Sequence, residues 1–324
     1  MSLRYPETFK VEPAAVGTPI DRFLRRRLSA DPPHVRKLLR QKRVLFSSAS
    51  SVDGKPIPGG AVMEAGEPLA AVGTVEVLAN DRERGPPSPN KKKRPAVLFA
   101  DQDLAVVVKP AGIAMHPGPR HGSDTLLNGL MSRYPELEHL GADRNWGLVH
   151  RLDLETSGGV VVARTEYAYE GLVEQFKARL IEKHYVGLVA IGERGLEPGT
   201  VKKPVAEKSA ITEIESIDRP GGDAPVAMVR CRPVTGRMHQ IRVHLAARHA
   251  PVLYDPRYGR GKDELTARLY LKRLALHAAV LGFAHPRTSR PVRHEQPLPR
   301  DLRHSWRRAR KLFDPAFDAP VKEE

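Results

Sequence analysis

The sequence predicts an α+β fold in two domains that are joined by a basic, proline-rich segment. Leu104–Val108 and Gly159–Ala163 are short, β-branched apolar runs bounded by Gly or Pro segments, which is typical of buried strands. Apolar residues recur at helical spacing from position 172 to 180. Residues 81–96 combine prolines, a glycine and like charges without apolar periodicity, so we interpret them as a solvated linker.

Before the linker, two apolar stripes predict two short helices followed by strands. The first stripe lies within Ile20–Leu28, and the second within Val35–Leu39, after Asp31 and two prolines have started a new helix. Val44–Phe46 begins a strand-like region, and we expect turns at Asp53-Gly54 and Gly59-Gly60.

The second of these helices leaves a basic face free of apolar residues. We expect the cations of this face to contact a polyanion, and they are Arg36, Lys37, Arg40, Lys42 and Arg43. Together with Ile20–Leu24 and the closing Val62–Glu67, this pattern resembles the small RNA-binding domain first described in a ribosomal small-subunit protein, here called the S-four-like domain. The resemblance implies phosphate contacts from this helix.

After the linker, further elements are expected. Leu172, Phe176 and Leu180 share one face of a predicted helix, and Lys183–Ile191 is typical of a strand. A last helix is indicated by the helical spacing of Leu302, Trp306, Ala309 and Phe313. We therefore expect a domain at residues 1–80, the linker at 81–96, a second domain at 97–314 and a tail at 315–324.

Charge and cysteine content limit the kinds of partner and site. The formal net charge is +15, densest in the N-terminal third, which favours a polyanionic partner. No apolar segment is long enough to span a bilayer, and no signal-peptide pattern is present, so we expect a cytoplasmic protein and no membrane partner. Cys231 is the single cysteine, which excludes a thiolate cluster within one chain. His239 and His244 lack zinc-helix spacing, and we expect no metal site.

The polar segment His150–Gly158 directly precedes a predicted buried strand. Polar loops that a buried strand holds in place commonly carry catalytic groups. Asp153 with Glu155 could form the carboxylate pair of a metal-dependent nuclease or a glycosidase, provided that the loop is extended. The segment differs from a kinase catalytic loop because Leu152 separates Arg151 from Asp153.

Residues 97–300 resemble the catalytic domain of the RluA-type pseudouridine synthases, which modify ribosomal and transfer RNA. Five blocks carry the resemblance in family order, namely Val107–Pro117, His150–Gly158, Lys183–Tyr185, Thr235–Leu245 and Leu276–Pro286. Val108, Met238 and Gly159 depart from the usual family residues, but none of them is at a catalytic position. The resemblance implies a mixed, largely antiparallel sheet with a central RNA cleft.

The resemblance also implies roles for four residues. The reaction breaks the bond from ribose C1′ to uracil N1, rotates the base and joins C1′ to C5, so a carboxylate near the sugar is needed. Asp153 matches the essential carboxylate, and Arg242 matches the arginine that favours its charged form and should lie within ion-pairing distance. Because a stacked uridine must be extruded, Arg151 matches the residue that fills the gap, and Tyr185 the aromatic that stacks on the base.

Three hypotheses remain open from the sequence. The first is an RNA isomerase that acts as a monomer on structured RNA, ribosomal in preference to transfer RNA, without cofactor or metal. The second is a non-catalytic RNA-binding protein, which predicts a damaged site, whereas Asp153, Tyr185 and Arg242 are all present. The third is a nucleic-acid hydrolase that uses Asp153 and Glu155 with a divalent ion, which would shorten the RNA.

Overall fold

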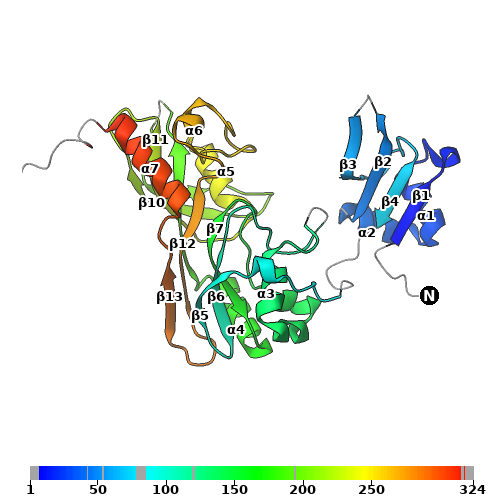
Figure 1. Ribbon diagram of the computed structural model, residues 1–324, viewed down its shortest axis with the longest axis horizontal. Helices are drawn as coiled ribbons and strands as arrows, with labels where there is room; N and C mark the ends of the chain where they lie inside the picture. The colour runs from blue at the N-terminus through cyan, green and yellow to red at the C-terminus, as the bar shows by residue number, and fades with distance from the viewer. Residues whose placement is uncertain are drawn as a thin grey trace, which may run out of the picture.

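The computed structural model describes residues 7–41, 43–52, 55–77, 85–118, 121–192, 195–314 and 317, with only the backbone for 49–52 and 55–61. These residues form two β-sheets, one of four strands and one of nine, with helices packed on both (Figure 1). Helices and sheets therefore share the chain as the α+β prediction required.

The four-stranded sheet lies in the N-terminal part and is antiparallel throughout. Its order is β1-β4-β2-β3, and its strands are β1 (Glu7–Val11), β2 (Val44–Val52), β3 (Lys55–Val62) and β4 (Gly73–Val77). Helices α1 (Ile20–Leu28) and α2 (Pro32–Arg40) bury the apolar stripes that the sequence predicted, in one cluster with Phe46 and Val75. Asp31 caps α2 by accepting a hydrogen bond from the backbone N–H of His34 at 2.9 Å.

The prediction of a turn at Gly59-Gly60 is wrong. Gly59 and Gly60 lie inside β3, and the register of β2 against β3 shifts between Phe46 and Ser48. The shift absorbs the extra residues of the glycine segment as a bulge, so the strand continues through it. The turn expected at Asp53-Gly54 falls outside the described residues.

The nine-stranded sheet is mixed but mostly antiparallel. Its order is β5-β6-β7-β12-β8-β11-β10-β9, β13 pairs with β12, and only β7 and β12 run parallel. The strands are β5 (Ala96–Ala100), β6 (Leu104–Lys109), β7 (Ser157–Ala163), β8 (Glu182–Ala190), β9 (Gly199–Lys202), β10 (Ile211–Asp218), β11 (Val226–Pro233), β12 (Leu276–Ala284) and β13 (Pro291–Glu295). The strands expected at 104–108, 159–163 and 183–191 are confirmed.

Helices cover this sheet on both faces, which explains its continuous apolar runs. In β7, Val160 and Val162 pack in a cluster with α3, whereas Val161 and Ala163 pack with α4. The α-helices here are α3 (Leu126–Arg133), α4 (Glu166–Lys177), α5 (Gln240–Ala247), α6 (Glu264–Arg268) and α7 (Arg300–Phe313). Short 3-10 turns are η1 (Pro13–Ala15), η2 (Lys91–Lys93), η3 (Pro135–Leu140) and η4 (Ala142–Gly147).

Two of these helices correspond to predicted stripes. The stripe expected on α7 is confirmed, because Leu302 and Ala309 are fully buried there. By contrast, α4 ends at Lys177, and Leu180 lies beyond it with 70% of its surface exposed. Arg179 has a left-handed backbone (φ +61°) that a helix cannot accommodate, so the predicted helix stops one turn early.

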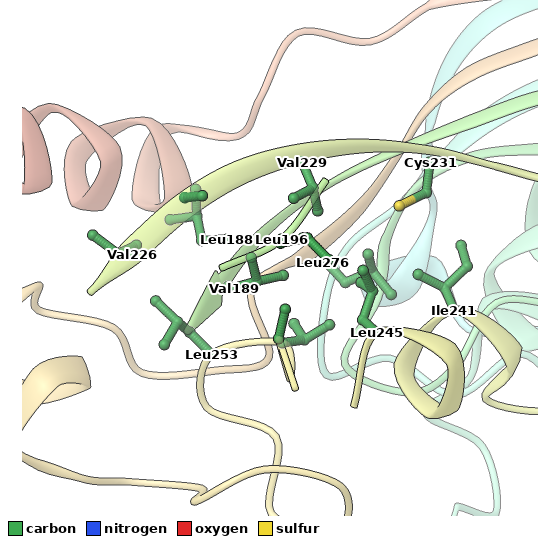
Figure 2. Packing of buried hydrophobic residues seen from close by; sticks show 14 of the residues in the cluster. Leu188, Val189, Leu196, Val226, Val229, Cys231, Ile241, Leu245, Leu253 and Leu276 are labelled. Carbon is green, nitrogen blue, oxygen red and sulfur yellow. The ribbon is translucent and has the colours of Figure 1, made fainter. Parts of the chain in front are cut away.

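The main core lies where β8 and β11 meet α5. Figure 2 shows Val189 of β8, Val229 of β11 and Ile241 and Leu245 of α5 in one cluster. Cys231 belongs to the same cluster, and burial raises the pKa of its thiol to about 12. The core thus fixes α5 to the strands from which the functional cleft is built.

The second half of the expected linker is attached to the larger domain. Asn90 hydrogen-bonds through its backbone N–H to Asn128 O at 2.8 Å, and the Arg94 guanidinium donates to Ser132 O at 2.6 Å. Both acceptors belong to α3. The segment from residue 88 is therefore not simply solvated, because its polar groups have partners on this helix and at Ser123 before it. None of the helices in the described ranges combines the length and the apolarity that a bilayer crossing requires.

Gly158 is a point of close approach between β7 and β12. It lies opposite Ala278 in the parallel pairing of these strands, and its φ is +134°. A Cβ at this position would lie 2.3 Å from the carbonyl oxygen of Ala278. Only glycine allows this backbone conformation and this approach without strain.

We expect Gly158→Ala to destabilise the larger domain by about 2–4 kcal/mol, through backbone strain and steric overlap. The free energy of unfolding in denaturant, measured on the transition of this domain, tests the expectation. Gly222→Ala is the matched control, because a Cβ there meets nothing within 4 Å. Equal unfolding midpoints for the two variants would show that β7 and β12 are not as close as described.

Candidate active site

A cavity of about 530 Å³ opens in the larger domain, where three separate segments of the chain meet. Residues 149–153 form one side, residues 233–242 form another, and the end of α4 with the start of β8 forms the third. All four residues that the sequence analysis assigned to the reaction line it, namely Arg151, Asp153, Tyr185 and Arg242. Residues about ninety positions apart are thereby brought to one site.

The expected ion pair between Asp153 and Arg242 is present. Arg242 Nη1 lies 3.1 Å from Asp153 Oδ2. The side chains are 9% and 19% exposed respectively, so the pair is largely shielded from solvent. A charge-assisted bond in such surroundings is stronger than one in water.

A second carboxylate, which the sequence analysis did not identify, holds Arg242 from the other side. Asp255 is fully buried, and its two oxygens accept from Arg242 Nε at 2.7 Å and Nη2 at 2.9 Å. The backbone N–H groups of Arg257 and Tyr258 also donate to Asp255 Oδ1. Asp255 was missed because it lies in an irregular turn without periodicity, although a lone Asp after the apolar Val252-Leu253 was a usable signal.

The pKa values of Asp255 and Arg242 depend on their burial and on their hydrogen-bond partners. Burial alone would raise the pKa of Asp255, but the hydrogen bonds from Arg242 and from two backbone N–H groups outweigh it and hold the pKa below its usual value. Burial works against the charge of Arg242, yet Asp255 and Asp153 together raise the pKa of the guanidinium. Asp255 therefore fixes both the charge and the direction of Arg242.

One buried glutamine, Gln240, holds the segment before α5 in place through hydrogen bonds. Gln240 Oε1 accepts from Thr235 Oγ1 at 2.6 Å and from the backbone N–H of Arg237 at 3.0 Å. Its Nε2 donates to Ile211 O and to Thr212 Oγ1, both on β10. The start of α5 is thus tied to the sheet, and Arg242 lies within the first turn of that helix.

A buried lysine anchors the loop that carries Asp153. Lys109 is completely buried, and its Nζ donates to the carbonyl oxygens of Pro110, Ile113 and Leu154 at 2.8–2.9 Å. Leu154 is the residue next to Asp153. Desolvation lowers the pKa of Lys109 to about 8, against the opposing attraction of Glu155 and Asp153. Lys109 therefore holds the backbone next to Asp153 in place.

His150 secures the beginning of the same loop. Its Nε2 accepts the backbone N–H of Val161 at 3.0 Å, and its ring stacks on Phe176 with 5.0 Å between centroids. Burial lowers the pKa of His150 to about 3, so the imidazole is neutral and can act as this acceptor. The role of His150 in the loop is therefore that of a neutral hydrogen-bond acceptor.

Tyr185 and Arg151 differ in their exposure. Tyr185 is partly buried on β8, and desolvation, with the negative charge of Asp153, raises the pKa of its phenol. The hydroxyl therefore stays protonated at neutral pH, and the ring offers a neutral aromatic face. Arg151 is exposed at the cavity and has no carboxylate partner among the residues that the structure describes.

Two further residues without a predicted role lie at the site: His239 is a neighbour of Asp153, and Tyr258 contacts His239 and Arg242. His239 Nε2 lies 3.9 Å from Asp153 Oδ1, and its Nδ1 lies 3.1 Å from the Tyr258 hydroxyl. Burial lowers the pKa of His239, although Asp153 opposes that change. The ring of Tyr258 also lies 5.2 Å from the Arg242 guanidinium carbon, which adds a cation–π contact to the site.

The basic face of α2 is present in part. Arg36, Lys37 and Arg40 are exposed, and Arg36 and Arg40 line a groove with Glu64 of the loop after β3. Lys42 lies outside the described residues. Arg43 does not share this exposed face, contrary to our expectation, because it follows the end of α2 and is only 8% exposed.

One acidic cluster has spacing that could suit a metal ion. Asp101, Asp103 and His285 bring ligand atoms within 4.8 Å of one another. However, Arg287 donates two hydrogen bonds of 2.6 Å to Asp103, and His285 Nε2 lies 2.8 Å from Asp101. The carboxylates are thus matched by protein cations or donors, and the cluster joins β5–β6 to the end of β12.

Comparisons with known proteins match this chain to one family. The family model for RNA pseudouridylate synthase matches residues 103–247. An uncharacterized RNA pseudouridine synthase of Chloroflexus aurantiacus is 35% identical over 311 residues, which is 90% of each chain. The ribosomal large subunit pseudouridine synthase C of Vibrio cholerae is 31% identical over 312 residues, covering 91% of this chain and 94% of that one.

Two further matches cover about two thirds of this chain. The ribosomal large subunit pseudouridine synthase D of Xanthomonas campestris is 38% identical over 225 residues, covering 64% of this chain and 66% of that one. The solved structure of human RNA pseudouridylate synthase domain containing 4 is 24% identical, with a TM-score of 0.52 over 66% of this chain and 93% of that one, and it is similar in fold. The family model, the relatives that match over nine tenths of the chain and the shared fold lead to one conclusion: the chain belongs to the RluA-type RNA pseudouridine synthases, which are isomerases.

Proposed function

We propose that this pseudouridine synthase acts on a uridine in structured ribosomal RNA and that Asp153 is its catalytic carboxylate. The observation that carries the proposal is the Asp153–Arg242–Asp255 arrangement at the cavity. Asp153 Oδ2 is bound by Arg242, whereas His239 at 3.9 Å is too far from Oδ1 for a hydrogen bond. One oxygen is therefore available to the sugar or the base.

The reaction needs little beyond these groups. The bond from C1′ to N1 breaks, the uracil turns, and C1′ bonds to C5. C5 then loses its hydrogen as a proton, and N1 gains a proton. No group is added or lost overall, and no electrons are exchanged with a second reactant. An ionised carboxylate held beside the ribose can act as nucleophile or base in such a sequence.

The target uridine has to leave its stack before it can enter the cavity. We propose that Arg151 fills the space that the uridine vacates, because this exposed residue lines the cavity next to Asp153. We propose that the extruded base stacks on Tyr185, whose neutral ring lines the same cavity. Both assignments are supported by position and by the family resemblance.

Ribosomal RNA is favoured over transfer RNA by the names of two relatives, both of which are ribosomal large subunit synthases. The net charge of +15 suits a large RNA in either case. We further propose that the enzyme acts as a monomer in the cytoplasm, a reducing compartment that fits a single, buried and unpaired cysteine.

We also propose that residues 1–80 form an S-four-like RNA-binding domain. Its support is the exposed row of Arg36, Lys37 and Arg40 on α2, beside a groove that could receive a backbone segment. Cations on one helix face contribute affinity through phosphate contacts and leave the chemistry to the larger domain.

The first test of the proposed function maps pseudouridine in ribosomal and transfer RNA of cells with and without this protein. We expect one or more ribosomal pseudouridines to disappear in its absence and to return with the wild-type protein. Asp153→Asn keeps size and polarity but removes basicity and nucleophilicity, so it should lower turnover at least about 1,000-fold while RNA binding persists.

Glu155→Gln is the matched control for that test, because it removes the neighbouring carboxylate of the same loop and should still restore the modification. Near wild-type turnover by Asp153→Asn would refute the assignment. Shortened RNA, or loss of activity in Glu155→Gln together with a need for divalent ions, would instead favour the hydrolase hypothesis.

The second test concerns the N-terminal domain in the full-length protein. Replacing Arg36, Lys37 and Arg40 by Gln should weaken RNA binding and reduce the slope of log K against log salt by about 2–3, with unchanged kcat. The equal-charge control replaces the exposed Arg25, Arg26 and Arg27 of α1 by Gln. Identical salt slopes for the two triple variants would contradict a specific role of the α2 face.

A further inference from the structure

The cavity is strongly positive beyond what the ion pair with Asp153 requires. Six cationic side chains line it, and Asp153 is the one carboxylate among the lining residues; the six are Arg151, Lys177, Arg179, Lys183, Arg237 and Arg242. Arg242 is engaged by two carboxylates, and Arg237 donates to Ser209 O. Lys177, Arg179 and Lys183 form one wall, at the turn from α4 into β8.

Lys183 is the most enclosed cation of this wall. It is partly buried, and its Nζ lies 5.9 Å from the centre of the Phe176 ring. Within the described part of the chain, no carboxylate forms an ion pair with it. Desolvation lowers the pKa of Lys183, and no charged partner among the described residues opposes the change. A cation that has lost water without gaining a counter-ion is costly, and an anion entering the cavity would relieve that cost.

The position of Lys183 relative to Tyr185 indicates which anion would fit. Side chains of a strand alternate between faces, so residues 183 and 185 point to the same side, about 6.6 Å apart along β8. His184 points to the other side, where it pairs with Glu182 and Glu215. A nucleotide whose base lies against Tyr185 has its phosphates at a similar distance from the base.

We propose that Lys183, with Arg179 and Lys177 at the rim, forms a subsite for a backbone phosphate that flanks the extruded uridine. This inference rests on the proposed binding of the base at Tyr185. The subsite holds the nucleotide after it has left the stack, because the ammonium can reach a phosphate only when that nucleotide lies inside the cavity. Lys183 therefore contributes to binding of the extruded state, not to the proton or bond changes at the sugar.

The test compares two small probes on the full-length protein at low salt, uridine 3′,5′-bisphosphate and uridine without phosphate. Dissociation constants from NMR titration give the preference for the bisphosphate. We expect Lys183→Gln to reduce that preference about tenfold, as loss of a charge-assisted hydrogen bond would. Lys183→Arg should retain most of it.

Lys272→Gln is the matched control, because Lys272 is exposed and does not line the cavity, and it should leave the preference unchanged. Circular dichroism of each variant establishes that it is folded. Uridine 5′- and 3′-monophosphate, titrated in the same way, identify which phosphate is bound.

Two outcomes would overturn the subsite. If Lys183→Gln keeps the full preference for the bisphosphate, the phosphate is bound elsewhere. If it weakens uridine and the bisphosphate equally, Lys183 contacts the base or the sugar. Neither outcome depends on turnover, so failure of the proposed Asp153 chemistry would appear separately, as an active Asp153→Asn variant.

Discussion

The site depends on one guanidinium held between two carboxylates. Asp255, fully buried, takes the Nε and Nη2 donors of Arg242 and leaves Nη1 for Asp153. A buried ion pair is stable only when its remaining donors and acceptors are satisfied, and here the backbone N–H groups of Arg257 and Tyr258 complete the shell of Asp255. The rest of the site can be understood as the means of keeping this arrangement in place.

Arg242 and Asp153 are positioned by different parts of the fold. Gln240 ties the start of α5 to β10, which directs Arg242. Lys109 anchors the loop at Leu154, and the close approach of Gly158 to Ala278 lets β7 run beside β12 directly after that loop. Because these restraints come from separate strands, the carboxylate is oriented before RNA arrives. Such preorganisation reduces what the enzyme must rearrange during the reaction.

The sequence predicted the strands at 104–108, 159–163 and 183–191 and the helices of the N-terminal part because local periodicity determines them. Asp153, Tyr185 and Arg242 were found through motif blocks, and their meeting in one cavity agrees with that reading. Asp255, His239 and Tyr258 were not found, since their contacts join distant segments and carry no periodic signal. Arg43 and Gly59-Gly60 were misjudged because the end of a helix and a bulge depend on tertiary packing.

The most direct measurement of the central claim is kcat/KM for the wild-type enzyme and for Arg242→Met, on an RNA that contains the mapped uridine. Arg242 joins Asp153 to the buried Asp255, so removing the guanidinium should leave Asp153 without its fixed partner and lower kcat/KM by about 100-fold or more. Near wild-type kcat/KM in Arg242→Met would contradict the account, even if Asp153 itself proves essential.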